Sequence, residues 1–415
     1  GTSLVVDSFS LFFKMLFLGI AILVIVLSVD YVAKHKFAGV GEYYTMLLFA
    51  TIGMMFMAAT TDLVMIYIGL ELTSISCYIL AGYHKKDPKS NEAILKYFLL
   101  GLISSAIMLY GFSFIYGFTG HTELSQIAQA LTGESAKLAV VAGVVFALAG
   151  FAFKVASVPF HQWVPDVYEG APAPITAFLS VGPKAAAFAA LIRILFIGFP
   201  VFASYWKVLF IAMAIASMFV GNLMAIPQTN IKRMLAYSSI AHAGYILVGF
   251  AVASNEAITG ILLYIAIYAI MNIGAFAIVM AVGHGSNGGE DLSNFNGLSK
   301  RAPFLAITMA IFMIALAGMP PTAGLWGKFY IFAAAVNKGL WWLALLGLFN
   351  SAISLYYYVN VIRHMYVLEP ATEAPLIFPI AYKGVVWATV LGTLIIGVMP
   401  GPLIWLSTIS SKGFG

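Results

Sequence analysis

Long apolar runs separated by short polar stretches dominate this chain of 415 residues. About twelve of them reach the length of roughly 20 residues that a helix needs to cross a bilayer. They span residues 9–32, 43–60, 63–82, 91–118, 136–159, 172–197, 204–226, 231–253, 257–282, 303–336, 340–366 and 385–409. The runs do not alternate with period two and are too long for transmembrane strands. The pattern therefore predicts an all-α polytopic membrane protein, with residues 1–415 forming a single membrane domain.

Composition supports a membrane protein and narrows its chemistry. Hydrophobic residues make up 62% of the chain and charged residues 9%, whereas about a quarter of the residues in soluble domains are charged. The single Cys77 excludes an internal disulfide and a cysteine metal cluster. The seven scattered histidines lack ligand spacings such as HExxH. We therefore expect no metal and no cofactor in this chain, and no signal peptide is predicted.

The basic residues fall unequally on the two ends of the predicted bundle. If the runs simply alternate in direction, one end receives Lys34, Lys36, Lys85, Lys86, Lys89, Lys232, Arg233, Lys300, Arg301, Arg363 and Lys383. The other end receives Lys137, Lys207, Lys338 and Lys412. Because cytoplasmic loops are enriched in Lys and Arg, the first end should face the cytoplasm. Both ends of the chain should then face the periplasm, and the basic residues indicate orientation and not a nucleic-acid partner.

Two lysines lie inside apolar runs that a proline-rich turn separates. The segment 147–193 reads ALAGFAFKVASVPFHQWVPDVYEGAPAPITAFLSVGPKAAAFAALIR and contains Lys154 and Lys184. An ammonium in hydrocarbon costs roughly 2.5–3.5 kcal/mol on insertion scales, so such residues normally face a protein interior or a water path. Lys154 is close enough to the end of its run to extend toward the headgroups instead. Lys184 is too deep for that, so a functional role is the favoured interpretation.

Glu71 is the one acidic residue predicted to lie deep in the membrane. The other 15 of the 16 acidic residues fall in loops or within about a turn of the end of a run. Its neighbours Thr73, Ser74 and Ser76 could solvate the carboxyl. Pairing with a buried lysine is favoured, because each partner lowers the desolvation cost of the other. We expect that partner to be Lys154.

Two runs contain helix-breaking residues. Run 136–159 ends at Pro159, and run 303–336 contains AGMPPTAGLWGKF, which includes Lys328. Proline removes a backbone donor, so both sites should free carbonyls at membrane depth. Broken helices in corresponding positions are typical of transporters with inverted repeats. The spacing predicts two inverted five-helix repeats, about 43–197 and 204–366, each broken in its fourth helix and flanked by helices 9–32 and 385–409.

Direct sequence support for these repeats is slight. The sequence ALAG occurs at 147–150 and at 315–318, and a proline followed by a tryptophan occurs at Pro159 and Trp163 and at Pro320 and Trp326. In so alanine-rich a chain, chance readily explains ALAG.

His242 lies near the middle of run 231–253. Histidine titrates near neutrality and suits a proton relay. A lone buried histidine can equally be a packed residue that only forms hydrogen bonds. The sequence leaves both interpretations open.

Four phrases of the chain together resemble a known family. They are GLELTSISCYIL, FKVASVPFHQWVPDVYEGAPAPITAFLSVGPKAAAFA, QTNIKRMLAYSSIAHAGY and LAGMPPTAGLWGKFYIF. The family is that of the antiporter-like membrane subunits of complex I, the proton-pumping NADH:quinone oxidoreductase, with relatives in cation/proton antiporters and membrane-bound hydrogenases. Within it, the chain resembles the subunit N branch, which includes mitochondrial subunit 2 and its chloroplast homologue. The family usually has further helices at its start, so we expect a truncated or unusually short member.

The resemblance implies roles in proton transfer for the deep ionisable residues. It implies Glu71 as the buried acid, Lys154 as its partner, Lys184 as the central carrier and Lys328 as the lysine of the second broken helix. His242 falls where the family often has a histidine.

The resemblance also implies a translocase subunit of the bacterial inner membrane or of an equivalent energy-transducing membrane. NADH, FMN, iron-sulfur clusters and quinone would be bound by partner subunits of complex I, among them neighbouring antiporter-like subunits. This chain has no dinucleotide fingerprint and no iron-sulfur ligands. Two alternatives stay open: a subunit of a cation/proton antiporter or membrane-bound hydrogenase, and a structural subunit whose buried charges only pack helices.

Overall fold

Every regular element of the protein is a helix over the residues that the computed structural model describes, which are 4–131, 137–285, 290–370 and 375–413. The α-helices are α1 (Ser8–His35), α2 (Val40–Ala59), α3 (Leu63–Ala81), α4 (Pro88–Thr119), α5 (Leu124–Ala130), α6 (Lys137–Val155), α7 (Trp163–Gly170), α8 (Ala173–Arg193), α9 (Ala203–Ala225), α10 (Ile231–Val252), α11 (Asn255–Gly285), α12 (Leu298–Arg301), α13 (Pro303–Ala317), α14 (Ala323–Asn337), α15 (Trp341–Tyr366), α16 (Ile380–Val398) and α17 (Gly401–Lys412). Short irregular helices follow α8, at Ile194–Gly198 and Pro200–Phe202, and a third precedes α12 at Leu292–Phe295.

The helices confirm the predicted class of polytopic membrane protein. By length and composition, ten helices of the described residues could each cross a membrane. Two shorter apolar helices, α6 and α13, correspond to the two runs that were predicted to be broken. Together they account for the twelve predicted apolar runs.

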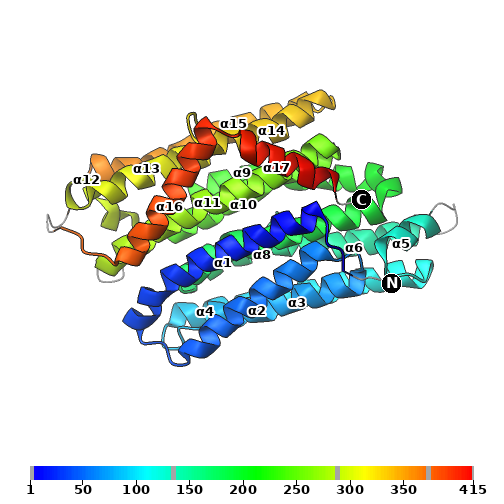
Figure 1. Ribbon diagram of the computed structural model, residues 1–415, viewed down its shortest axis with the longest axis horizontal. Coiled ribbons are helices and arrows are strands. Elements are labelled where there is room, and N and C mark those ends of the chain that lie inside the picture. Colours follow the sequence, from blue (N-terminus) through cyan, green and yellow to red (C-terminus); the bar gives the residue numbers. More distant parts are fainter. Residues whose placement is uncertain (1–3, 132–136, 286–289, 371–374, 414–415) are drawn as a thin grey trace.

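Three helices form the centre of the bundle. The membrane-spanning parts of α8 and α10 are buried along their whole length, and that of α11 almost so. Figure 1 shows these helices between helices α2 to α4 and the later helices α13 to α15. The flanking helices α1 and α16 pack against α8 and α11 respectively. The central helices are thus shielded from lipid, and they carry Lys184 and His242.

Both predicted breaks are present. After α6 the chain leaves helical geometry at Ala156, which has a left-handed φ of 62°, and it becomes helical again at Trp163. After α13 it turns at Gly318, with a φ of 88°, and α14 begins at Ala323. Left-handed backbone suits glycine, and the adjacent prolines cannot continue a helix. Lys154 therefore precedes its break, whereas Lys328 follows its own.

The last predicted run, 385–409, differs from the structure. It was expected to be one helix, but α16 ends at Val398 and α17 begins at Gly401. Pro400 separates them, because a residue before proline is disfavoured in the α conformation. Two stretches between the predicted runs also contain short helices, α5 and α12.

The local structure recurs at an offset of 168 residues. The backbone N–H groups of Leu63 and Leu124 donate to the carbonyls of Thr122 and Thr61, and those of Ile231 and Leu292 donate to the carbonyls of Glu290 and Thr229. Each residue of the second set is numbered 168 higher than its counterpart. The two ALAG sequences have the same offset.

The matched turns also lie at opposite ends of the bundle. The first turn leads into α5 and the second into the segment before α12, and α5 and α12 are at opposite ends in Figure 1. This arrangement supports the predicted inverted repeats, whose boundaries at about 43–197 and 204–366 stay a prediction.

Candidate functional site

Lys154 lies in the last turn of α6 and reaches across to α3. Its side chain is buried, and its Nζ donates to Ser74 Oγ at 2.7 Å and to Tyr78 OH at 3.0 Å. The ammonium also faces the rings of Tyr78 and Phe153, at 5.4 and 5.5 Å from their centroids. Two neutral hydroxyls and two aromatic faces therefore surround a cation at the edge of the break.

Glu71 lies one turn before Ser74 on α3. No ion pair joins it to Lys154 in this structure, because the ammonium bonds to Ser74 and Tyr78 instead. The oxygen Oε1 of Glu71 is buried and has no hydrogen-bond partner.

The sequence left open that hydroxyls near Glu71 solvate its carboxyl, and the structure shows these hydroxyls bonded elsewhere. Thr73, Ser74 and Ser76 donate to carbonyls of their own helix, at Gly69, Leu70 and Leu72. Such bonds back to the preceding turn are common for Ser and Thr inside helices. The direct Glu71–Lys154 pair would thus require a movement of side chains or of the α6 end.

Lys184 follows Pro183 in the middle of α8. Its Nζ donates to the hydroxyl of Ser239 and, at 3.4 Å, to the Ser239 carbonyl. The Tyr168 ring lies 5.7 Å away. Pro183 cannot donate to the carbonyl of Leu179 four residues earlier, and the Tyr168 hydroxyl approaches that carbonyl at 3.5 Å. Tyr168 of α7 thus approaches a carbonyl that the proline leaves without its helical partner, and its ring faces the lysine that follows the proline.

Lys328 lies five residues after the start of α14 and turns back to the break. Its Nζ donates to the Ala317 carbonyl at 2.8 Å and to Ser351 Oγ at 2.7 Å. Ala317 is the last residue of α13, so its carbonyl is one that the break frees. The Tyr245 ring lies 4.8 Å from the ammonium. The predicted freed carbonyl is therefore present, and the buried lysine uses it.

His242 lies on α10 between the contacts of Lys184 and those of Lys328. The residues three before and three after it are Ser239 and Tyr245, which share one face of the helix. Its Nδ1 lies 2.7 Å from Tyr264 OH and its Nε2 lies 3.1 Å from Tyr358 OH. A neutral imidazole has one donor and one acceptor nitrogen, so one phenol donates to the ring and the other accepts from it. His242 is thus hydrogen-bonded on both nitrogens, and it lies on the α10 face between Ser239, the partner of Lys184, and Tyr245, whose ring faces Lys328.

Only a narrow space separates Lys154 from α8. A cavity of about 10 Å³ lies between Lys154, Pro183 and Ala187. This volume is near the lower limit for one water molecule, roughly 10–15 Å³. Lys154 and the Lys184 helix are therefore close to direct contact, with room for little besides a single water.

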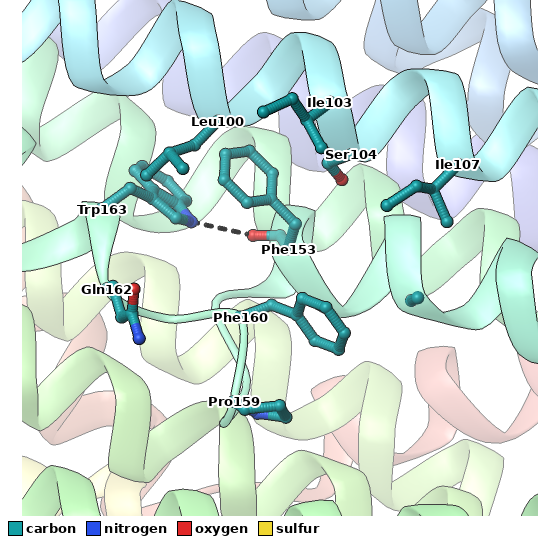
Figure 2. A pocket seen from close by; sticks show the side chains of 10 residues that line it. Leu100, Ile103, Ser104, Ile107, Phe153, Pro159, Phe160, Gln162 and Trp163 are labelled. Carbon is teal, nitrogen blue, oxygen red and sulfur yellow. Dashed lines mark hydrogen bonds between the residues drawn. The ribbon is translucent and has the colours of Figure 1, made fainter.

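A second cavity lies beside the first break. Figure 2 shows its lining, in which Leu100 and Ile103 of α4 face Phe153, Phe160 and Trp163 across the turn. Its volume is about 160 Å³. The Trp163 indole N–H donates to the Phe153 carbonyl at 3.1 Å, which ties the start of α7 to the end of α6. The cavity leaves space into which the turn after Lys154 can move.

A larger apolar groove leads from the protein surface to Lys328. It has a volume of about 580 Å³ and runs between α14 and α15, with Lys328 and Ser351 among its lining residues. Phe329, Leu345 and Leu348 line it and are more than half exposed.

The hydroxyl partners of Lys184 and Lys328, and those of His242, were not predicted from the sequence. Ser239, Ser351, Tyr264 and Tyr358 are common residue types at unremarkable positions. The available signal was the spacing of Ser239, His242 and Tyr245 on one helix face. Among the described residues, no group of three or more His, Cys, Asp or Glu side chains could hold a metal ion.

A helical membrane bundle with two broken helices and three buried lysines, each bonded to neutral oxygens, is a protein of the ion-translocating class. A family model described as the NADH:quinone oxidoreductase/Mrp antiporter transmembrane family matches residues 60–354. The chain belongs to this family.

Individual relatives agree with this assignment. The chain is 48% identical to NADH-quinone oxidoreductase subunit N of Trichlorobacter lovleyi, over 97% of this chain and 83% of the relative. A chain of respiratory complex I from Thermus thermophilus is 32% identical with a TM-score of 0.82, over 97% of this chain and 87% of that one. A chain of an archaeal membrane-bound sulfane sulfur reductase is 30% identical with a TM-score of 0.91, over 98% and 82%. The fold and the subunit N resemblance are thereby confirmed.

Proposed function

We propose that this chain is the proton-translocating subunit N of a respiratory NADH:quinone oxidoreductase. One observation carries the proposal: Lys154, Lys184 and Lys328 are each less than 8% exposed and donate only to neutral oxygens. Because a buried ammonium without a carboxylate is costly, the neutral amine is within energetic reach, and each site can hold or release a proton.

The order of the sites follows from the helices that connect them. Glu71 lies on α3 one turn from Ser74, which accepts from Lys154, and Lys154 is next to α8, which carries Lys184. From Lys184, the α10 face with Ser239, His242 and Tyr245 leads to Lys328. We propose that protons pass along this row in the plane of the membrane. In this role the ring proton of His242 would move between Nδ1, which faces Tyr264, and Nε2, which faces Tyr358.

The redox chemistry belongs to partner subunits. NADH, FMN, iron-sulfur clusters and quinone would be bound there. Quinone reduction would be coupled to proton transfer in this chain through a conformational or electrostatic change. The groove beside Lys328 has an exposed apolar lining, which suits contact with lipid or with a neighbouring membrane subunit. We propose another antiporter-like subunit as that neighbour, in a bacterial inner membrane with both chain ends on the periplasmic side.

The test replaces the central lysine in the assembled complex. Lys184→Ala should reduce proton pumping at least roughly tenfold while leaving the complex assembled, since an apolar residue removes the desolvation cost but carries no proton. Lys184→Arg should also be impaired, because a guanidinium hardly releases its proton. Pumping is measured in vesicles together with NADH:quinone turnover. Full pumping by the Arg variant would contradict a titrating role.

The family description also names an antiporter, which favours a cation/proton antiporter subunit as the second candidate. The same lysines would serve it. Vesicles that contain this chain without redox partners would then show a cation-dependent pH change. Their failure to do so, with NADH-driven pumping in the full complex, supports the first proposal.

A further inference from the structure

Ionic contacts converge on α7, the short helix after the first break. Asp166 and Glu169 lie three residues apart on one face of it. Asp166 accepts from Lys96 Nζ at 2.5 Å, and Glu169 accepts from Lys89 Nζ at 2.7 Å, both from α4. Arg233 Nη1 from α10 bridges the two carboxylates, at 2.7 and 2.9 Å. We call Lys89, Lys96, Asp166, Glu169 and Arg233 the α7 clamp.

A buried lysine holds the end of the same helix. Lys232 is 2% exposed, and its Nζ donates to the carbonyls of Glu169 and Ala171 at 2.7 and 2.9 Å. These carbonyls are among those that a helix end leaves without partners, and a cation is favourable there. Its third contact is Glu290 Oε1 at 2.8 Å. Two residues of α10 therefore bind α7: Arg233 binds its carboxylates, and Lys232 binds the backbone carbonyls at its end.

The centre of the clamp is Arg233. Lys89 and Lys96 are 64% and 41% exposed, whereas Arg233, Asp166 and Glu169 are 28%, 29% and 18% exposed. Exposed ion pairs contribute little, so the inner contacts of Arg233 should matter most.

Both clamp carboxylates stay charged at neutral pH. Burial alone would raise the pKa of Asp166, but hydrogen bonds from Lys96 and Arg233 hold that pKa below its ordinary value of 3.8. For Glu169, burial is likewise outweighed by hydrogen bonds from Lys89 and Arg233, and its pKa lies below 4.5. The clamp therefore keeps its charge wherever the proposed pump would operate.

The opposite faces of the two clamped helices form the Lys184 site. Tyr168, between the clamp acids in sequence, is fully buried and lies over the Lys184 ammonium. Ser239, six residues after Arg233 on α10, accepts from that ammonium. Movement of α7 relative to α10 would shift Tyr168 and Ser239 relative to each other, and with them both neutral partners of Lys184.

We propose that the α7 clamp sets the geometry of the Lys184 site, and that Arg233 is a positioning residue for proton transfer there. The inference rests on the proposed function. Among the described residues no ion pair involves α14, the helix after the second break. Helix α7, beside the central Lys184, is thus held by ion pairs, whereas the described residues of α14 form none.

The test is a double-mutant cycle in the full complex with Arg233→Gln and Glu169→Gln. Pumping per quinone reduced should fall roughly tenfold in Arg233→Gln, as expected for the loss of charge-assisted hydrogen bonds. The double variant should be little worse than the worse single one, because both remove the same contact. Arg233→Lys should recover part of the loss, since a lysine can reach one carboxylate. The matched control is Lys86→Gln, an exposed lysine at the same end of the bundle.

Assembly is quantified for each variant, so that pumping refers to assembled complex only. If Arg233→Gln does not assemble, Arg233→Lys and Glu169→Gln carry the test, because each keeps part of the clamp. Wild-type pumping by the assembled variants, with Lys184→Ala still defective, would overturn the clamp and leave the proposed function intact. Normal pumping by Lys184→Ala would instead contradict the proposed function, and the inference about the clamp, which rests on that function, would fail with it.

Discussion

Buried charges in this protein are of two kinds at the level of single residues. Arg193 is fully buried and pairs with Asp7 at 2.8 Å, and Lys232 is 2% exposed and pairs with Glu290. In both cases a carboxylate offsets the cost of burying the cation. Lys154, Lys184 and Lys328 have only hydroxyls and carbonyls. The paired cations are suited to holding helices together, and the unpaired lysines to changing their charge.

Glu71 and Lys154 should be energetically coupled although no ion pair joins them in the structure. Glu71 lies one turn from Ser74, which accepts from the Lys154 ammonium, and its buried Oε1 has no hydrogen-bond partner, so we expect the carboxylate to act on the lysine electrostatically. Glu71→Gln should slow pumping, and combining it with Lys154→Met should give a strongly non-additive loss. Glu71→Asp keeps the charge and should retain much more activity.

The control for that cycle pairs Lys154→Met with Ser76→Ala. Ser76 is on the same helix, and its hydroxyl donates to Leu72 of that helix and not to Lys154. Its effect should simply add to that of the lysine. If the logarithmic losses of Glu71→Gln and Lys154→Met add in the same way, the two groups act independently.

At the scale of elements, glycines permit the closest approach around the second break. A Cβ atom placed on Gly324, at the start of α14, would lie 1.7 Å from the carbonyl oxygen of Ala315 in α13. The two halves of the broken helix must separate to accept it. Gly324→Ala should therefore destabilise the protein by about 2 kcal/mol or more, measured as the thermal or denaturant unfolding of the purified chain.

Gly19→Ala provides the matched control in α1, because no atom lies within 4 Å of a Cβ at that position. Alanine is the better helix former by about 0.5–1 kcal/mol, so this variant should be neutral or slightly more stable. Equal behaviour of the two alanine variants would mean that the α13–α14 contact is not tight.

Periodicity and proline predicted the elements better than they predicted the contacts. Long apolar runs identify spanning helices because a bilayer requires a minimum length, and Pro159 and Pro320 mark the breaks. The bend at Pro400 was missed because the apolar run continues through it, and α5 and α12 are too short to show a period. The deep ionisable residues were identified by the cost of their burial. Their partners Ser239, Ser351 and Tyr358 were not, because hydropathy does not determine which helix faces meet.

The whole molecule combines two matched halves with a difference in charge between its ends. The turns offset by 168 residues lie at opposite ends of the bundle, whereas the basic loops gather at one end. An inverted repeat alone would make the two sides of the bundle equivalent and would favour neither orientation in the membrane. From the excess of Lys and Arg at the end that holds the α7 clamp, we predict that this end faces the cytoplasm.

That direction is tested by labelling from each side of the membrane. Lys85→Cys, beside Lys86, and Lys300→Cys, beside Arg301, replace exposed residues at the predicted cytoplasmic end, and Lys338→Cys replaces an exposed lysine at the other end. The native Cys77 is buried and should contribute little background. A membrane-impermeant thiol reagent should label the first two only in inverted vesicles and the third only in intact cells, because eleven of fifteen loop lysines and arginines lie on the first side. The opposite labelling pattern would invert the molecule and place both chain ends in the cytoplasm. Labelling of Lys85→Cys and Lys300→Cys from different sides would contradict the order of crossings itself.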